Sequence, residues 1–160
     1  MWISLKQKSK GFTLIELLVV IAIIGILSTV ATVSLVQARR RARDTKRISD
    51  IQQLRSALLI YSNQRATYPL TNLGSYPVGP IVLGIGTAKC LDTVDDGFHD
   101  ECDAASVIMQ RVPSDPAGYQ YSKTGDSSYN IVFTLEGEIG ALPGGICTAT
   151  QEGITCVPVP

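Results

Sequence analysis

The feature that most constrains this 160-residue chain is an uncharged stretch of twenty residues from Leu17 to Val36. As a helix rising about 1.5 Å per residue it is about 30 Å long, which matches the hydrocarbon core of a bilayer. A secretory signal peptide has a shorter apolar region followed by a small-x-small cleavage site, and no such site ends this stretch cleanly. The sequence therefore predicts a membrane-spanning helix over residues 12–36.

Charge is distributed unevenly along the chain, although the net charge is zero. Residues 1–65 contain eleven Lys and Arg against three Asp and Glu, a net charge of +8, and residues 66–160 contain three against eleven, a net charge of −8. A chain of this length has room for one modest globular domain. We therefore expect a basic helical stalk that leads into an acidic head over residues 66–160.

A single charge, Glu16, lies within residues 12–36. A carboxylate at the edge of a spanning helix is costly unless it is paired, so it points to function. It completes the string Lys10-Gly11-Phe12-Thr13-Leu14-Ile15-Glu16, which directly precedes the apolar stretch. This string resembles the class III leader of type IV pilins and type II secretion pseudopilins, and its residue types at fixed offsets make the motif specific.

The resemblance implies how the chain is processed and where it lies. In that family a membrane aspartyl peptidase cuts after the glycine on the cytoplasmic side and then methylates the new amino terminus. Carried over, the cut falls between Gly11 and Phe12, removes a leader of residues 1–11 and leaves a methylated Phe12. The implied location is the bacterial inner membrane, as a single-pass precursor with its head outside the cytoplasm. The filament would then lie in the periplasm or at the cell surface.

The resemblance also implies partners and an assembly mechanism. The expected partners are further copies of the chain, minor pilins or pseudopilins, the prepilin peptidase, an inner-membrane assembly platform with its ATPase, and membrane lipid. Cleavage would create an α-amino group four residues before Glu16, which can pair with the Glu16 carboxylate of a neighbour strongly in low dielectric. We therefore expect Phe12 and Glu16 to direct assembly. The alternative is that Glu16 reaches the membrane interface as an incidental charge.

The helix is expected to continue to about residue 65, because no Gly or Pro interrupts residues 26–68. Over residues 37–65, apolar side chains recur at spacings of 3, 3, 4 and 3 and form an amphipathic stripe: Ile48, Ile51, Leu54, Leu58 and Tyr61. Val33 stands where family members commonly have a helix-bending proline. The predicted fold is α+β and pilin-like, with one long N-terminal helix packed on a small antiparallel β-sheet head.

A basic cluster follows the predicted span, with six Lys and Arg from Arg39 to Arg47. Because basic flanks tend to stay in the cytoplasm, six cations after the span against three lysines in the leader favour an inverted orientation, with the N-terminus outside the cytoplasm. The leader motif requires a cytoplasmic N-terminus, and we follow the motif. The cluster lies within two turns of the span and has no interleaved aromatic residues. We therefore expect lipid headgroups or acidic neighbouring heads as its partners, and no nucleic acid.

The sequence of the head predicts a loop followed by β-structure. Residues 70–89 are rich in Gly, Pro, Ser and Thr and predict a loop with at most short strands. Residues 119–123 and 129–136 are strand-like on either side of a turn, as are 146–150 and 154–158. Residues 112–121 also resemble, more loosely, the major pseudopilin of type II secretion.

Four cysteines lie in the head, and their even number suits disulfides in an oxidising compartment better than any common zinc pattern. Free thiols in a reducing cytoplasm are the alternative, against which the membrane segment argues. A turn at 151–153 places Cys147 opposite Cys156 or one residue out of register, close enough for a disulfide. Cys90 and Cys102 form the second local pair.

Residues 90–103 contain six acidic side chains. Asp92, Asp95, Asp96 and Asp100 offer the hard oxygen ligands that calcium prefers, although the EF-hand pattern is absent. Major pseudopilins bind calcium in the head, but their ligands cannot be matched to these positions. A solvated acidic loop closed by Cys90 and Cys102 is the favoured interpretation, since runs of charge usually stay solvated.

No enzyme site is indicated: the sequence contains no phosphate-binding glycine loop and no metal-binding helix motif, and His99 has no evident nucleophile partner. Apart from calcium, no cofactor is expected. The predicted function is a structural subunit of a type IV pilus-like or type II secretion filament. Two alternatives stay open, a DNA-uptake pseudopilin and a monomeric, membrane-tethered extracytoplasmic binding domain.

Overall fold

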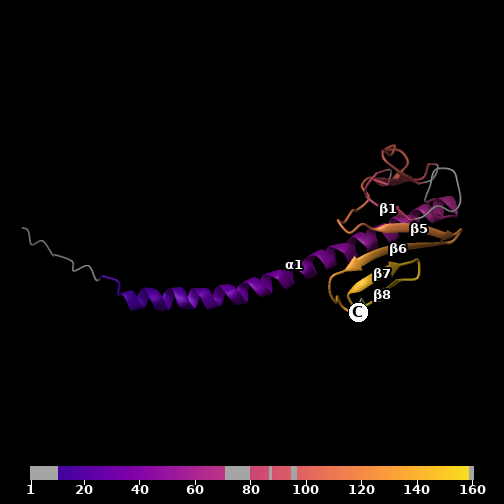
Figure 1. The fold of residues 1–160 in the computed structure, drawn as a ribbon. Helices are drawn as coiled ribbons and strands as arrows, with labels where there is room; N and C mark the ends of the chain where they lie inside the picture. Colours follow the sequence, from indigo (N-terminus) through magenta and orange to yellow (C-terminus); the bar gives the residue numbers. More distant parts are fainter. Residues whose placement is uncertain (1–10, 71–79, 87, 95–96, 159–160) are drawn as a thin grey trace, which may run out of the picture. The chain divides into compact units, whose positions relative to one another are not determined.

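The computed structural model describes residues 11–70, 80–86, 88–94 and 97–158. In these residues helix α1 (Leu14–Arg65) is followed by β1 (Ile81–Val82), β2 (Cys90–Asp92), β3 (Phe98–His99), β4 (Val107–Met109), β5 (Gln120–Gly125), β6 (Ser128–Leu135), β7 (Gly145–Ala149) and β8 (Ile154–Val157) (Figure 1). The chain divides into two units, residues 1–39 and residues 40–160, which are described separately below.

The first unit consists, in its described part, of the N-terminal portion of α1, and none of its residues from 11 to 39 is buried. The helix is unbroken at Val33, the position where a proline is common in the pilin family. Its hydroxyl groups donate to backbone carbonyls of the preceding turn: Ser28 to Ile24, Thr29 to Ile26, Thr32 to Ser28 and Ser34 to Val30. These side chains are therefore satisfied within the helix, as a lipid environment requires.

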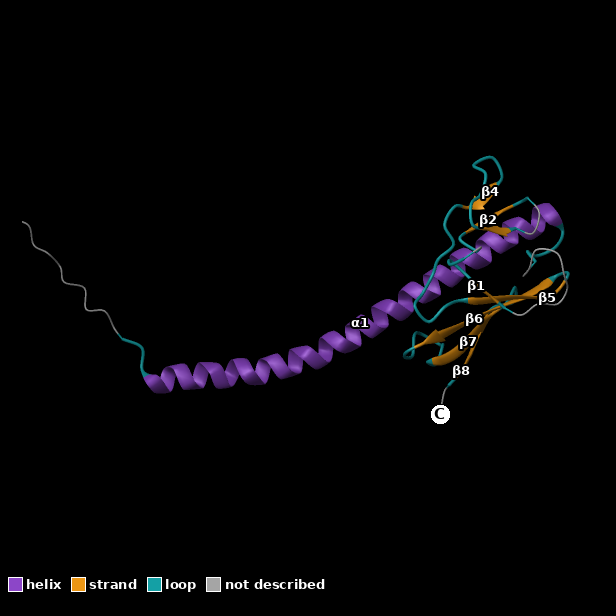
Figure 2. Cartoon of the chain, turned by 45° about the horizontal axis from the view of Figure 1, so that its top comes forward, coloured by secondary structure: helices purple, strands orange, loops and turns teal. Residues whose placement is uncertain are grey.

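The second unit combines residues 40–65 of α1 with two antiparallel sheets (Figure 2). The larger sheet has the strand order β1-β5-β6-β7-β8, so β5 to β8 form a meander, with tight turns after β5 and β7 and a longer connection over residues 136–144. The smaller sheet has the order β3-β2-β4. A long helix together with antiparallel sheets confirms the predicted α+β, pilin-like architecture.

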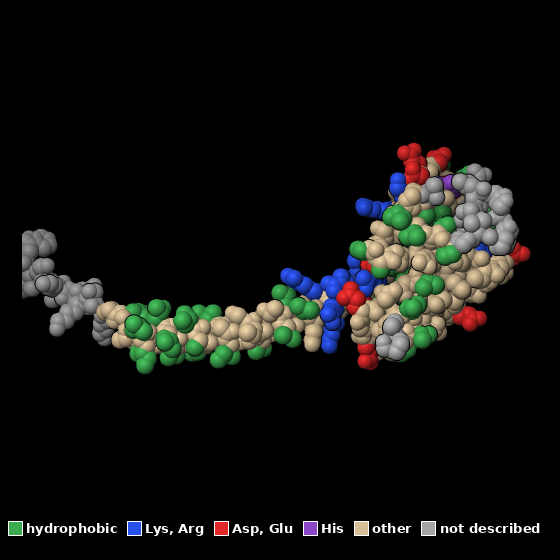
Figure 3. Space-filling model, in the orientation of Figure 1, with side chains coloured by type: hydrophobic (Ala, Val, Ile, Leu, Met, Phe, Trp, Pro, Cys, Tyr) green, Lys and Arg blue, Asp and Glu red, His purple; other side chains and the backbone are tan. Residues whose placement is uncertain are grey.

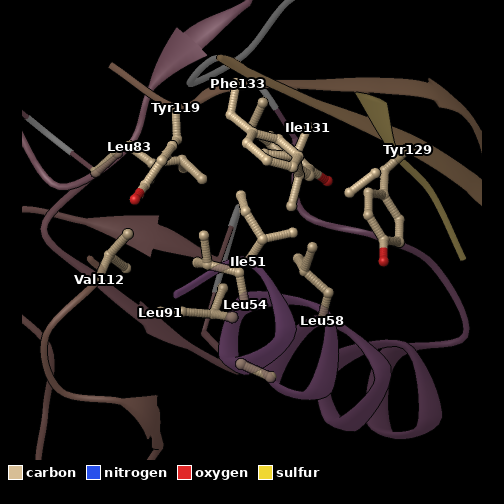
Figure 4. Packing of buried hydrophobic residues seen from close by; sticks show 14 of the residues in the cluster. Ile51, Leu54, Leu58, Leu83, Leu91, Val112, Tyr119, Tyr129, Ile131 and Phe133 are labelled. Atoms are coloured by element: carbon tan, nitrogen blue, oxygen red, sulfur yellow. The ribbon is translucent and has the colours of Figure 1, made fainter. Parts of the chain in front are cut away.

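The core of the second unit forms between α1 and the sheets (Figure 4). Ile51, Leu54 and Leu58 are completely buried, Tyr61 is nearly so, and Ile48 is partly buried, which confirms the predicted stripe. From the larger sheet the alternate residues of β6 point inward, as a half-buried strand requires: Tyr129, Ile131, Phe133 and Leu135. The 3- and 4-residue spacing of the helix thus meets the 2-residue spacing of the strand.

Two strand predictions in the head are close, and one turn is shorter than expected. β7 and β8 occupy nearly the predicted ranges, and Cys147 lies directly opposite Cys156. β5 and β6 extend into the predicted turn over residues 124–128, because Gly125 pairs with Ser128 after a register shift that begins at Lys123. The connection between the strands is therefore reduced to Asp126 and Ser127.

The acidic segment, residues 90–103, was expected to be a loop, and that expectation is wrong for β2 and β3, which form the smaller sheet together with β4. Gly97, which directly precedes β3, lies against the C-terminal end of α1. At a φ of +94° it leaves no room for a side chain, since a Cβ there would be 2.7 Å from the Tyr61 ring. Leu91 and Asp92 of β2 are buried.

Candidate functional site

The leader motif ends at the start of helix α1. Gly11, Phe12 and Thr13 are exposed and precede the first helical residue, Leu14. The Gly11–Phe12 peptide bond therefore lies in exposed, non-helical backbone, the form in which a peptidase can bind a chain. The structure contains no peptidase, so cleavage and methylation at Phe12 stay predictions.

Thr13 acts as the N-cap of the helix. The Glu16 amide donates to the Thr13 hydroxyl oxygen at 3.3 Å, and the same hydroxyl lies 3.4 Å from a Glu16 carboxylate oxygen. Glu16 consequently lies in the first turn, where the helix dipole favours an anion. Within residues 11–39 no cation pairs with Glu16, so any such partner has to come from elsewhere.

The surface that follows the motif is apolar over its whole length. Large apolar side chains from Leu14 to Val36 are between 43 and 82 % exposed, and they cover this part of α1 (Figure 3). By length and composition α1 contains a segment that can cross a membrane. An apolar surface this large marks a region that contacts lipid or other proteins.

Inside the second unit, the charged residue Asp44 is almost completely buried. Its carboxylate accepts hydrogen bonds from the backbone amides of Glu136, at 3.0 Å, and Gly137, at 2.9 Å, just after β6. Arg47 lies one turn further along the helix and donates to Asp44 at 2.8 Å. Asp44 thus ties the helix to the end of the central strand.

Arg47 is the centre of this network. It is 7 % exposed and donates to Asp115 at 3.0 Å and to Glu136 at 3.2 Å, as well as to Asp44. Arg43 adds two hydrogen bonds to Glu136, at 2.8 and 2.6 Å. We call Arg43, Asp44, Arg47, Asp115 and Glu136 the charged anchor. It joins three segments that are far apart in the sequence.

The pKa values of two carboxyl groups of the anchor, Glu136 and Asp115, are lowered. The hydrogen bonds from Arg43, helped by its charge, lower the pKa of Glu136 to about 2. Burial alone would raise the pKa of Asp115, but hydrogen bonds from Arg47 and from the Ala117 amide hold it below its ordinary value. Nearby, burial and the hydrogen bond to Asp50, 2.9 Å long, raise the pKa of Tyr119. Glu136 and Asp115 are therefore ionised at neutral pH and form ion pairs with Arg43 and Arg47.

Sequence reasoning missed this anchor and assigned Arg43 and Arg47 to a cluster with outside partners. That assignment is wrong for these two residues, whose partners lie in the same chain. A signal was present: Asp44 and Arg47 extend the stripe, giving spacings of 3, 4, 3, 4 and 3 through Ile51, Leu54, Leu58 and Tyr61. Charged residues that continue an apolar stripe occupy buried positions and need partners.

The cysteines are joined as Cys90–Cys102 and Cys147–Cys156, the two local pairs that their spacing predicts. The first links β2 to the segment after β3. The second crosses the β7–β8 hairpin at directly opposed positions, with the Cα atoms 4.0 Å apart. Cys147 is completely buried in the core, so this disulfide fixes the last strand to the rest of the head.

The predicted calcium ligands do not come together in the described part of the chain. Asp92 is buried, accepts a hydrogen bond from the Val94 amide at 2.9 Å and lies 3.4 Å from His99, so it is not part of a solvated loop. Asp100 pairs with Lys89 at the surface. Asp95 and Asp96 lie outside the described residues. No group of three possible ligands occurs among the described residues, and calcium binding stays a prediction, to be checked by a thermal-shift titration.

A cleft lies beside the C-terminal part of α1. It is lined by Gln52, Arg55, Ser56, Leu59, Tyr68, Tyr129 and Gln151. The charged group of this cleft, Arg55, donates to the Thr150 and Gln151 carbonyls at 3.0 and 3.3 Å. Its guanidinium therefore holds the β7–β8 turn.

The chain is similar to known proteins both in its leader motif and over most of its length. Residues 6–32 match the family model for the prokaryotic N-terminal methylation motif. The type II secretion system core protein G of Vibrio cholerae serotype O1 is 31 % identical over 131 residues, covering 81 % of each chain. That of Escherichia coli strain K12 is 32 % identical over 83 % of this chain and 86 % of its own, and that of Aeromonas hydrophila is 32 % identical over 84 % and 89 %.

No solved structure matches the chain significantly. The similarity to these relatives extends over more than four fifths of this chain and of each relative. The chain therefore belongs to the family of the type II secretion system core protein G, the major pseudopilins.

Proposed function

We propose that the chain is a pseudopilin, a structural subunit of a type II secretion filament that assembles through its apolar N-terminal helix. One observation carries the proposal: the described residues up to Arg39 form an exposed helix that buries none of its apolar side chains, directly behind a methylation motif. Such a surface needs lipid before assembly and neighbouring helices after it. A structural role, without catalysis, agrees with the relatives being secretion-system core proteins.

Processing and topology follow from the same motif. The leader of residues 1–11 is removed in the cytoplasm, Phe12 becomes the methylated amino terminus, and the head lies outside the cytoplasm. The two disulfides support an oxidising compartment for the head. The partners are the prepilin peptidase, the assembly platform with its ATPase, minor pseudopilins and further copies of the chain.

Assembly depends on Glu16 in this proposal. Its carboxylate lies in the first turn, pairs with no cation among the described residues of its own unit and enters an apolar environment. The amino terminus of Phe12 on an adjacent subunit supplies the missing positive charge. Pairing the two removes the cost of an uncompensated charge and sets the register between helices.

Processing is tested by mass spectrometry of the amino terminus of protein recovered from its native membrane. We expect a chain that begins at methylated Phe12. Gly11→Glu should block cleavage, because a bulky charged side chain occupies the scissile position, whereas Gly11→Ala should be partly tolerated. Recovery of wild-type protein with Met1 intact would remove the main support for the proposal.

Assembly is tested by replacing Glu16. Glu16→Ala should leave membrane insertion and head folding intact, because neither uses the carboxylate, and should sharply reduce filament formation and secretion. Glu16→Gln keeps the shape but cannot form the ion pair, and it should fail in the same way. Glu138→Ala, which removes an exposed carboxylate from the head, is the matched control. Normal assembly of Glu16→Ala would instead favour a membrane-tethered binding domain.

A further inference from the structure

The basic cluster after the apolar segment is divided by the structure into two groups. Arg43 and Arg47 donate to carboxylates of the head and form part of the charged anchor. Arg39, Arg40, Arg41 and Lys46 are exposed, and within the described residues of the chain none of their side chains has a hydrogen bond or an ion pair. We call Arg40, Arg41 and Lys46, the three that belong to the second unit, the basic collar. Lys46 acts on Asp115 only through its charge, so the donors of all three side chains remain available to a partner.

The collar residues point in different directions around the helix. Successive residues of an α-helix are rotated by about 100°, so Arg40, Arg41 and Lys46 are separated by about 100 to 140° around the axis. Lys and Arg side chains project both above and below this part of α1 in the view of Figure 3. A protein that docked on one face of the helix would contact one or two of them. A planar charged surface that the helix crosses can attract all three.

The distance along the helix favours such a surface. Arg40 and Arg41 follow Val36, the last residue of the uncharged stretch, by four and five positions. That corresponds to a rise of about 6 to 7.5 Å. The polar headgroup layer on each side of a bilayer is about 5 to 7 Å thick. Lys46, about 9 Å further on, stays within the range of the surface potential of an anionic membrane.

We propose that the basic collar binds the anionic headgroups of phospholipids in the leaflet that faces the head. The proposal rests on the proposed function, because it requires α1 to span the membrane. Phosphate is the fitting ligand, since a guanidinium offers two parallel donors to its oxygens. Zwitterionic headgroups carry a balancing cation and are weaker ligands. The collar thus holds the unassembled subunit at a fixed depth among acidic lipids.

The test uses the full chain in mixed detergent micelles with equal amounts of phosphatidylglycerol and phosphatidylcholine of the same acyl chains. Native mass spectrometry measures the ratio of the two lipids retained by the protein. Wild-type protein should retain phosphatidylglycerol preferentially, and added salt should reduce the preference. Arg40→Gln/Arg41→Gln should lower the preference by about tenfold or more.

The matched control is Arg65→Gln/Arg111→Gln, which also removes two exposed cations whose side chains form no ion pair or hydrogen bond within the described residues, but away from the collar. It should keep the wild-type preference. Equal loss in the control and the collar variant would mean that net charge, not the collar, selects the lipid, and would overturn the proposal. Near-ultraviolet circular dichroism checks that both variants fold, and the single variant Lys46→Gln provides a milder test.

Two further arms separate the proposal from related ones. Inorganic phosphate added in excess should not displace the lipid; displacement would show a general anion site and overturn the proposal. Cross-linking of the collar to acidic residues of a second copy, with no lipid preference, would also overturn it. Alkaline carbonate extraction of vesicles tests the span itself. A chain that is extracted contradicts the proposed function, whereas a chain that stays inserted without lipid preference contradicts the collar alone.

Discussion

Residues 14–39 and 40–65 of helix α1 belong to different units, and their polar side chains find hydrogen-bond partners in different places. The first part buries no side chain, and its serine and threonine hydroxyls are satisfied by its own backbone. The second part buries Asp44, Arg47 and Asp50, and the head supplies partners to all three. The stability of the second part is therefore set within the chain, whereas the first part needs surroundings that the chain does not provide.

Of the changes considered, replacing Arg47 should reduce the stability of the second part of the helix and the head most strongly. Arg47→Ala leaves Asp44 and Asp115 without their shared cation, and removing one partner of a buried ion pair costs about 3 to 5 kcal/mol. Denaturant unfolding of the full chain in detergent, followed by near-ultraviolet circular dichroism, should show this loss. Thr45→Ala, at an exposed position of the same turn, should change the stability by less than about 0.5 kcal/mol. Equal effects would mean that the anchor does not stabilise the head.

Leu54 and Leu59 compare a buried and an exposed position of the second part. Leu54 is completely buried and Leu59 is 56 % exposed. Leu54→Ala should cost about 2 to 5 kcal/mol, because it leaves a cavity between the helix and the sheet. Leu59→Ala should cost much less in the same unfolding measurement. A small effect at Leu54 would indicate that the helix packs on the head differently from the arrangement described.

The two disulfides of the head can be compared by the stability that each contributes. Cys147→Ala/Cys156→Ala removes a bond that closes a loop of about ten residues, and the chain-entropy model gives a loss of about 2 to 3 kcal/mol. Replacing Cys90 and Cys102 should reduce the stability by a similar amount, by the same argument. Thermal unfolding of the two double variants measures both effects, and non-reducing peptide mapping of the wild type checks the pairing. Links between Cys90 and Cys147 would contradict the arrangement.

The smallest expected effect is a dependence of stability on pH. The pKa of Glu136 is lowered from 4.5 to about 2 in the folded chain. A depressed folded pKa contributes stability that is fully present above the unfolded value and is lost as the pH falls through the folded value. The melting temperature of the head should therefore fall between about pH 4.5 and pH 2. Arg43→Gln removes the largest cause of the shift and should flatten this part of the profile; an unchanged profile would exclude Glu136 as its source.

Several properties followed from the sequence because they depend on neighbouring residues. The uncharged stretch predicted the exposed apolar helix, and the stripe through Ile51, Leu54 and Leu58 predicted the face that packs on the head. The short spacing of Cys147 and Cys156 around a turn predicted their pairing. Each pattern lies within one element or one hairpin, so its period or spacing can be read directly from the chain.

Other properties were decided by the tertiary structure. Asp44 and Arg47 looked like part of an exposed basic segment, and Asp92 looked like part of a solvated loop. The partners of the anchor residues lie 68 to 93 positions away, and Asp92 is buried in the smaller sheet, next to His99 of the adjacent strand. A charged side chain is stable in the interior when such distant groups satisfy it. The sequence shows where the charged residues lie along the chain. Only the packed fold determines which of them are buried and which, like Arg40 and Arg41, remain free for a partner.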